Sequence, residues 1–332
     1  MHVRSYGGVT GSTAPAFTLV EMLVSMAVLG LLIVMINQVF SSAAMTTTQG
    51  NKHMDADAQA RALFDRMAVD FGQMVKRSDV DYFLKSSATD QNGNTQPQTG
   101  SGATSGSNDQ IAFYSQVPGY YPAASAQSPL SLVAYRVNSN PNSPYWNQLQ
   151  RFGCGLLWNG ASSVYSPMVF SRSPTSLLPN SLSLNWPTAT SAVLDDGTNY
   201  ESIGPQILRM EYYYLVQSGT DFPILTTTPW DARVAGHASV NGLQDVAAIS
   251  VAIAVIAPKS QMLVSGSQLA ALSAAMEDFS PNMHSPGNGP TQAGDLEAQW
   301  ESTLIGSLPA GIPRSAASSI RVYRRDFYLP KN

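Results

Sequence analysis

The sequence places a single carboxylate, Glu21, inside a long apolar run. Residues 17–40 read FTLVEMLVSMAVLGLLIVMINQVF, and Glu21 is the only charged residue among them. An ionised side chain at the centre of a bilayer costs about 2.5–3.5 kcal/mol on insertion scales, and less near the interface. A charge in such a place normally has a partner. The position therefore predicts that Glu21 meets a group that relieves its charge.

One acidic loop elsewhere brings oxygen ligands close together in the sequence. Asp195, Asp196 and Glu201 lie within the stretch DDGTNYE. Calcium prefers carboxylate and carbonyl oxygens, so these three residues are a weak candidate calcium site. The spacing of an EF-hand is missing, however, and an ordinary Asp-Gly turn explains the same stretch. The turn is the favoured interpretation, and the sequence predicts no metal and no cofactor.

The remaining reactive side chains form no recognisable catalytic motif. There is no HExxH zinc motif, no GxSxG nucleophile elbow and no phosphate-binding glycine loop in a strand–helix context. Cys154 is the only cysteine, which excludes an intramolecular disulfide and a cysteine-based zinc cluster. The four histidines are scattered, at His2, His53, His237 and His284. We therefore expect a protein that is not an enzyme.

Composition narrows the class of protein further. Hydrophobic residues make up 44% of the 332 residues and charged residues only 12%, against about 25% charged residues in soluble domains. Serine, threonine, asparagine, glutamine and glycine make up the difference, which favours an exported, β-rich protein. The formal net charge of −4 indicates no general attraction to nucleic acid.

The apolar run is long enough to cross a membrane as a helix. About 24 residues at 1.5 Å rise give roughly 36 Å of helix, against a bilayer core of about 30 Å. Residues 1–16 contain Arg4 and no acidic residue, so the N-terminus is expected in the cytoplasm and the rest outside it. The alternatives are a secretory signal, a plain signal anchor and a buried soluble helix. A secretory signal is disfavoured because the small residues precede the apolar run. A plain signal anchor is disfavoured by Glu21, and a buried helix of a soluble protein is disfavoured by the length of the run.

The residues around the start of this run carry a family resemblance. Ala16-Phe17-Thr18-Leu19-Val20-Glu21, followed by the apolar run, resembles the prepilin cleavage and methylation signal of type IV pilins and type II secretion pseudopilins. The resemblance implies that a prepilin peptidase cuts between Ala16 and Phe17 and N-methylates Phe17. That family usually has Gly before the cut, where this chain has Ala16. The resemblance also implies a subunit-assembly site at Thr18 and Glu21, with the Glu21 carboxylate facing the Phe17 amine of a neighbouring subunit.

The region 41–85 is expected to hold an amphipathic helix. After a polar stretch at 41–51 that is poor in helix formers, apolar residues between 60 and 75 recur with helical spacing. Arg61, Asp65, Arg66, Asp70 and Lys76 are assigned to the polar face. The segment ARALFDRMAVDF at 60–71 is similar to the corresponding helix of the large minor pseudopilins of the J type. Residues 86–108 are predicted to be a flexible loop.

The rest of the chain, 109–332, is expected to form a β-rich globular head. Strands are predicted at 110–114, 130–137, 149–158, 207–216, 246–257 and 320–329, and short helices at 266–279 and 295–304. The fold class is therefore α+β, with a long N-terminal helix packed on an antiparallel head. Residues 109–158 and 246–258 also resemble the pilin-like group known as Verru_Chthon cassette protein C.

Together these features predict a minor pilin or pseudopilin, a structural subunit of a type IV pilus-like or type II secretion filament. Its expected partners are a prepilin peptidase, other pilin or pseudopilin subunits and an assembly platform in the inner membrane. It would be a single-pass inner-membrane protein with a periplasmic head before it enters a filament. The alternative from another class is an exported adhesin, carbohydrate-binding protein or enzyme that uses the same anchor.

Overall fold

The computed structural model describes residues 18–76, 108–109, 111–121, 126–138, 142–155, 200–217, 224–226, 246–280 and 291–330. The chain divides into two compact units, Met1–Asn51 and Lys52–Asn332. The first unit contains the N-terminal part of helix α1 (Leu19–Gly72), and the second contains the rest of α1 together with the sheet and the shorter helices.

In the first unit, α1 is an apolar helix with exposed side chains. The stretch Leu19–Thr47 has the length and composition to cross a membrane, and nothing in the described chain buries it. The sequence indicated weak helix formers at 41–51, yet α1 continues through them. Thr46 Oγ1 donates to the carbonyl of Ser42 at 3.0 Å and Thr47 Oγ1 to that of Ala43 at 2.9 Å. These polar side chains are satisfied within the helix, so they do not interrupt it.

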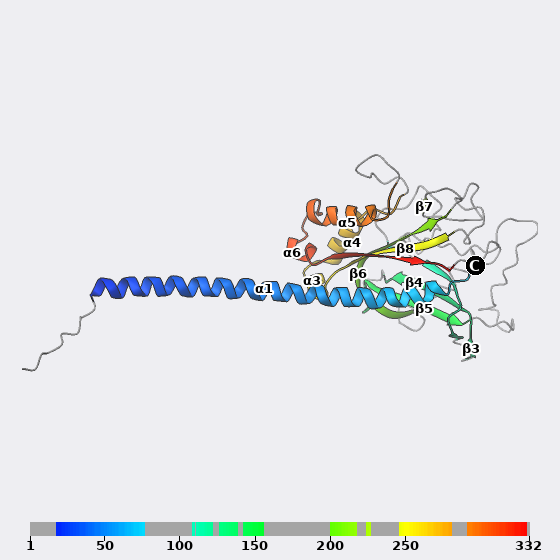
Figure 1. The fold of residues 1–332 in the computed structure, drawn as a ribbon, viewed down its shortest axis with the longest axis horizontal. Coiled ribbons are helices and arrows are strands. Elements are labelled where there is room, and N and C mark those ends of the chain that lie inside the picture. Colours follow the sequence, from blue (N-terminus) through cyan, green and yellow to red (C-terminus); the bar gives the residue numbers. More distant parts are fainter. Residues whose placement is uncertain are drawn as a thin grey trace, which may run out of the picture. The chain divides into compact units, whose positions relative to one another are not determined.

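The second unit is built on a seven-stranded antiparallel sheet (Figure 1). The strand order is β1-β4-β5-β6-β8-β9, and the short β7 also pairs with β6. The bounds are β1 (Ile111–Ser115), β4 (Ser131–Val137), β5 (Gln148–Gly155), β6 (Tyr200–Val216), β7 (Ile224–Thr226), β8 (Val246–Val255) and β9 (Arg321–Tyr328). A separate hairpin pairs β2 (Gly119–Tyr121) with β3 (Ala126–Ser128). The predicted α+β class is confirmed, with an antiparallel sheet.

Six of these strands correspond to predicted ones, and β6 is the main difference. It begins at Tyr200, earlier than the predicted 207, and pairs first with β5 and then with β8. Gly204 and Pro205 lie in the added part, and both residue types are depleted in strands. A shift in register between Gln148 and Gln150 of β5 accommodates them. The strands β2, β3 and β7 were not predicted because each is only three residues long.

One face of the sheet is covered by the second-unit part of α1. Ala60, Leu63, Phe64, Met67 and Phe71 are all buried against the sheet. The Phe71 ring lies 4.7 Å from that of Phe113 in β1 and 5.0 Å from that of Phe327 in β9, measured between centroids. The apolar stripe predicted from helical spacing is therefore the face that packs on the sheet.

The opposite face is covered by the helices α4 (Gly266–Ala275), α5 (Asp295–Gly306) and α6 (Arg314–Ala317). The short helix α3 (Pro258–Gln261) lies beside α6. Strand β8 shows how the two cores share one sheet: Val251 and Ile253 pack on the α1 side, whereas Ala252 packs with Leu269 and Trp300 of the helices. This alternation follows from the two-residue period of a strand. The predicted helices at 266–279 and 295–304 are confirmed as α4 and α5, with different ends.

Two residues assigned to the polar face of α1, or just beyond it, are buried instead. Asp70 has no exposed surface and Lys76 is 5% exposed. The Lys76 ammonium donates to the carbonyl of Val246 at 3.1 Å, and Asp70 accepts hydrogen bonds from Tyr135 and Arg151. The assignment was wrong because helical spacing orders residues around the axis but does not show how widely the sheet covers the helix.

Candidate functional site

The first turn of α1 carries two of the predicted assembly residues. Thr18 precedes the helix, and its backbone N–H donates to Glu21 Oε2 at 2.9 Å. The Thr18 hydroxyl donates to the same oxygen at 3.0 Å, and the Glu21 N–H donates back to Thr18 Oγ1 at 3.3 Å. This reciprocal pattern is a capping box, in which the side chains three residues apart satisfy each other's backbone groups.

The capping box gives Glu21 a partner within its own chain. The carboxylate also lies at the N-terminal end of a helix, where the helix dipole favours a negative charge. Both bonds from Thr18 use Oε2, and Oε1 accepts none from the part of the chain that the structure describes. Glu21 is exposed, so Oε1 is open to a cation from another molecule. The geometry thus shows Glu21 capping the start of α1 through one oxygen of its carboxylate.

The apolar side chains that follow Glu21 face away from any protein core. Leu23, Met26, Leu29, Leu31 and Val34 are each more than half exposed. An exposed apolar surface of this length marks a contact with a membrane or with other proteins. The first unit therefore offers a continuous apolar surface that begins at one carboxylate.

The other predicted site residues are not brought together within the described residues. Ala16 and Phe17, the predicted cleavage and methylation site, lie outside them, as do Asp195 and Asp196. Glu201 lies in β6 and is exposed. No group of three or more His, Cys, Asp or Glu side chains able to hold a metal ion occurs in the described ranges. The calcium hypothesis is therefore untested.

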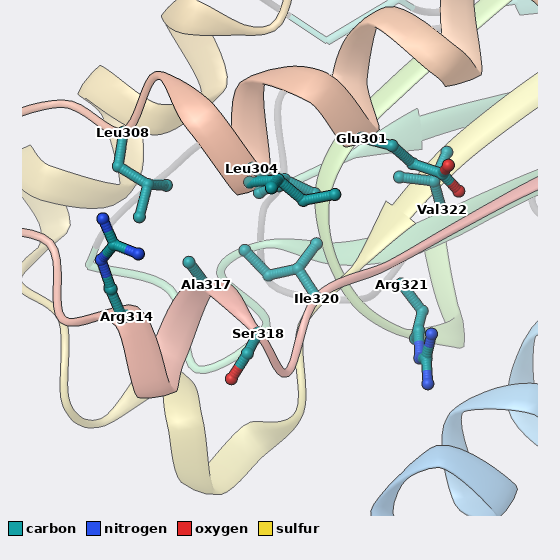
Figure 2. Close-up of a pocket in the computed structure, with 10 residues that line it drawn as sticks. Glu301, Leu304, Leu308, Arg314, Ala317, Ser318, Ile320, Arg321 and Val322 are labelled. Carbon is teal, nitrogen blue, oxygen red and sulfur yellow. The ribbon is translucent and has the colours of Figure 1, made fainter.

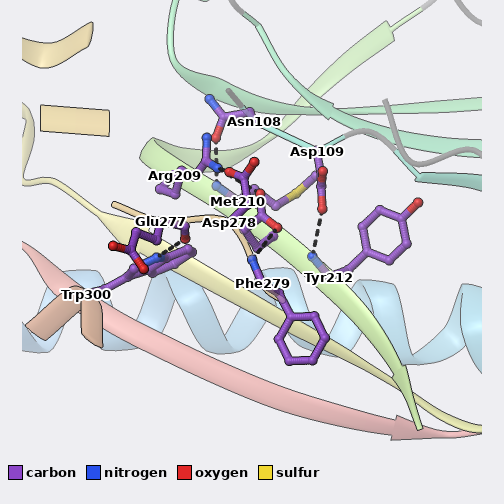
Figure 3. Close-up of polar contacts among 10 residues, drawn as sticks. Asn108, Asp109, Arg209, Met210, Tyr212, Glu277, Asp278, Phe279 and Trp300 are labelled. Atoms are coloured by element: carbon purple, nitrogen blue, oxygen red, sulfur yellow. Dashed lines mark hydrogen bonds and ion pairs between the residues drawn. The ribbon is translucent and has the colours of Figure 1, made fainter. Parts of the chain in front are cut away.

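A buried polar cluster in the head was not anticipated from the sequence (Figure 3). Arg209 of β6 has no exposed surface, and its Nη2 donates to Glu211 Oε1 at 2.9 Å and to the carboxylate of Asp278. Met210 N–H donates to Asn108 Oδ1 at 2.7 Å, and Tyr212 N–H donates to Asp109 Oδ2 at 3.1 Å. These contacts fasten the segments before β1 and after α4 onto β6, which indicates a structural role.

Part of this cluster, the pair of Arg209 and Glu211, could be predicted from its spacing in the sequence. Residues 209 and 211 are two apart in a strand, so an arginine and a glutamate at these positions share one face of the sheet. Next to them, the Trp300 indole N–H donates to the carbonyl of Glu277 at 2.9 Å (Figure 3). Tyr213 stacks on Phe279 with ring centroids 4.2 Å apart. The contact with Asp278 could not be read from spacing because 69 residues separate it from Arg209.

A pocket of about 450 Å³ opens in the head between α5, α6 and the start of β9 (Figure 2). Its apolar lining comes from Leu304, Ile305, Leu308, Ala317, Ile320 and Val322. Its charged lining residues are Glu301, Arg314 and Arg321. The charged groups lie around an apolar interior, an arrangement suited to an amphiphilic ligand and not to a metal ion.

Comparison with protein families places the N-terminal site in a known class. Residues 15–37 match the family model of the prokaryotic N-terminal methylation motif. The match includes Thr18, Glu21 and the first part of the exposed apolar helix. No curated protein matches the chain. The chain thus carries a prepilin-type methylation motif on an apolar helix, which supports a precursor of the type IV pilin-like kind.

Proposed function

We propose that this protein is a minor pilin or pseudopilin, a structural subunit assembled through its N-terminal helix. The observation that carries the proposal is the methylation motif at 15–37, placed on an exposed apolar helix that starts at the Thr18–Glu21 capping box. A structural role also suits the buried charged groups around Arg209 and Asp70, which join segments of the head to one another. The resemblances to J-type minor pseudopilins and to the Verru_Chthon cassette protein C group belong to the same proposal.

The proposed processing step creates the partner of Glu21. Prepilin peptidase hydrolyses the peptide bond between Ala16 and Phe17 and methylates the released amine. The new ammonium of Phe17 is one residue away from Thr18 along the chain. An ammonium and a carboxylate that both enter an apolar environment stabilise each other, because each relieves the desolvation cost of the other. In a filament, Oε1 of Glu21 would accept the Phe17 ammonium of the adjoining subunit.

We further propose a single-pass topology, with residues 1–16 in the cytoplasm and the head in the periplasm until assembly. The sparse positive charge before the helix supports this orientation. A head as large as Lys52–Asn332 would crowd a helical fibre if it were repeated at every position. The size therefore favours a low-copy subunit near the filament tip.

Mass spectrometry of the mature N-terminus tests the processing step. The expected result is a chain that begins with N-methylated Phe17 when the protein is made together with prepilin peptidase. A catalytically inactive peptidase should leave Met1 in place in a parallel preparation. An intact N-terminus with the active peptidase, or a cut beyond residue 40, would refute the proposal.

Substitution of Glu21 separates its two roles. Gln retains the capping box, since glutamine serves at that position as glutamate does, but it removes the charge. Glu21→Gln should therefore insert and fold normally yet enter filaments poorly, and Glu21→Ala should behave similarly. If Glu21→Gln enters filaments as well as the parent while Glu21→Ala does not, capping alone explains the residue and the charge-pairing proposal fails.

A further inference from the structure

One end of the head exposes apolar side chains beside cations. It is formed by α3, the turn after it, α6 and the C-terminal turn of α5, which lie together in Figure 1. Met262 is 80% exposed, Leu263 59% and Ile305 79%. Lys259 and Arg314 are exposed on α3 and α6. We call these five residues, with the pocket beside them, the α3/α6 surface.

The pocket gives this surface depth. Figure 2 shows Leu304, Leu308 and Ile320 along its interior, with Arg314 at one end and Arg321 at the other. Two arginines and one glutamate are the charged residues among its ten lining residues. An apolar interior flanked by guanidinium groups fits a molecule with an apolar body and an anionic head.

An aromatic side chain packs at the start of α4, three residues beyond Leu263 in the chain. A Cβ added to Gly266 at the start of α4 would lie 3.4 Å from the Trp146 ring, so this ring packs directly against that helix end. Tyr145, its neighbour, is 36% exposed. Tryptophan and tyrosine are enriched where proteins meet the polar region of a bilayer. Exposed apolar groups flanked by aromatic rings and cations are the composition of membrane-surface contacts.

The head is tethered to the apolar helix through the chain itself. The stretch able to cross a membrane ends at Thr47, and the hydroxyl of Tyr323 donates to Asp57 Oδ1 at 2.5 Å. About ten residues along the chain separate Thr47 from Asp57. Tyr323 is two residues from the pocket residue Arg321. The pocket therefore belongs to a unit that a short length of chain tethers to the stretch able to cross a membrane.

We propose that the α3/α6 surface binds the headgroup region of an anionic phospholipid bilayer. The inference rests on the proposed anchoring of the chain by α1. Lys259 and Arg314 contact lipid phosphates, Met262, Leu263 and Ile305 enter the acyl boundary, and the pocket accepts part of one lipid. Because the anchor already holds the head close to the membrane, its local concentration is high and a weak surface suffices. Binding holds the head against the membrane before the subunit leaves it.

Amide hydrogen exchange of the full-length chain in lipid nanodiscs tests this proposal. Discs of phosphatidylcholine alone are compared with discs that also contain phosphatidylglycerol. We expect exchange in peptides covering 259–265 and 304–309 to be several-fold slower in the anionic discs, and added salt should reverse this protection. Lys259→Glu with Arg314→Glu should abolish it, and Ile305→Ser should weaken it.

Matched controls lie on the exposed side of α1 in the same unit. Arg61→Glu reverses an exposed charge, and Val69→Ser removes a side chain that is 52% exposed. Both should leave the protection unchanged. Equal exchange in the two kinds of disc overturns the proposal. Protection that depends on the number of protein chains per disc and not on the lipid charge overturns it as well. A chain that fails to enter discs refutes the anchor itself, whereas a chain that enters without protection refutes only this inference.

Discussion

Asp70 of α1 and Arg151 of β5 form a two-point ion pair inside the head. Arg151 Nε lies 2.7 Å from Asp70 Oδ2, and Arg151 Nη2 lies 3.0 Å from Asp70 Oδ1. The Tyr135 hydroxyl donates to the same carboxylate, and Ser115 Oγ donates to the Asp70 carbonyl at 2.8 Å. Burial, followed by the Asp70 charge, raises the pKa of Tyr135. Three strands thus contact one residue of the helix.

This geometry predicts that Asp70 is a principal link between α1 and the sheet. Asp70→Ala would leave Arg151 charged and largely buried without its partner, and breaking a buried pair in this way costs about 3–5 kcal/mol. We expect a markedly lower unfolding midpoint for the head of the detergent-solubilised full-length chain, measured by circular dichroism. Arg151→Met in the same chain should recover much of the loss, because it removes the unpaired charge. A loss below about 1 kcal/mol for the single variant would contradict the prediction.

A second ion pair between the same helix and the sheet should contribute far less to the stability of the head. Arg325 Nη1 lies 2.5 Å from Asp65 Oδ1, but the two side chains are 39% and 61% exposed. Exposed pairs contribute about 0–1 kcal/mol because water and salt screen them. Asp65→Ala should therefore shift the unfolding midpoint only slightly, and less still at high salt. A loss as large as that of Asp70→Ala would show that burial does not distinguish the two pairs.

Sequence patterns predict the secondary structure of this chain better than its long-range contacts. The apolar stripe of α1 and six strands follow from periodicity, since side chains such as Leu63 and Val251 repeat with the period of their element. The contact of Asp70 with Tyr135 joins residues 65 apart, which no local pattern contains. The three-residue spacing of Thr18 and Glu21 is that of a capping box, so this local contact is readable from the sequence.

The capping box itself can be tested without changing any charge. Thr18→Ala removes the hydroxyl that donates to Glu21 and accepts from its N–H. Loss of such a cap costs about 1 kcal/mol of helix stability, so the first turn of α1 should fray. We expect faster amide exchange at residues 19–22 in nanodiscs, whereas Thr18→Ser should exchange as the parent does. Unchanged exchange in Thr18→Ala would show that the cap does not hold this turn.

Glu297 of α5 should make the stability of the head dependent on pH. In the part of the chain that the structure describes, neither of its carboxylate oxygens has a hydrogen bond to another residue. Burial raises the pKa of this carboxyl above its ordinary value, although its own backbone N–H and the nearby Arg324 oppose the shift. A raised pKa in the folded state means that the folded protein binds the proton more tightly than the unfolded chain. The stability contributed by the protonated form is present below the unfolded pKa and is lost as pH rises through the folded pKa.

At neutral pH the parent therefore carries the cost of a buried, poorly paired carboxylate, which a neutral amide reduces. Glu297→Gln should stabilise the head by on the order of 1 kcal/mol at pH 7, and the difference should vanish in acid, where Glu297 is protonated. Unfolding midpoints measured across this pH range check both parts. Glu301→Gln, an exposed position on the same helix, should change stability at neither pH. If the two variants respond alike, the effect belongs to the net charge of the head and not to the burial of Glu297.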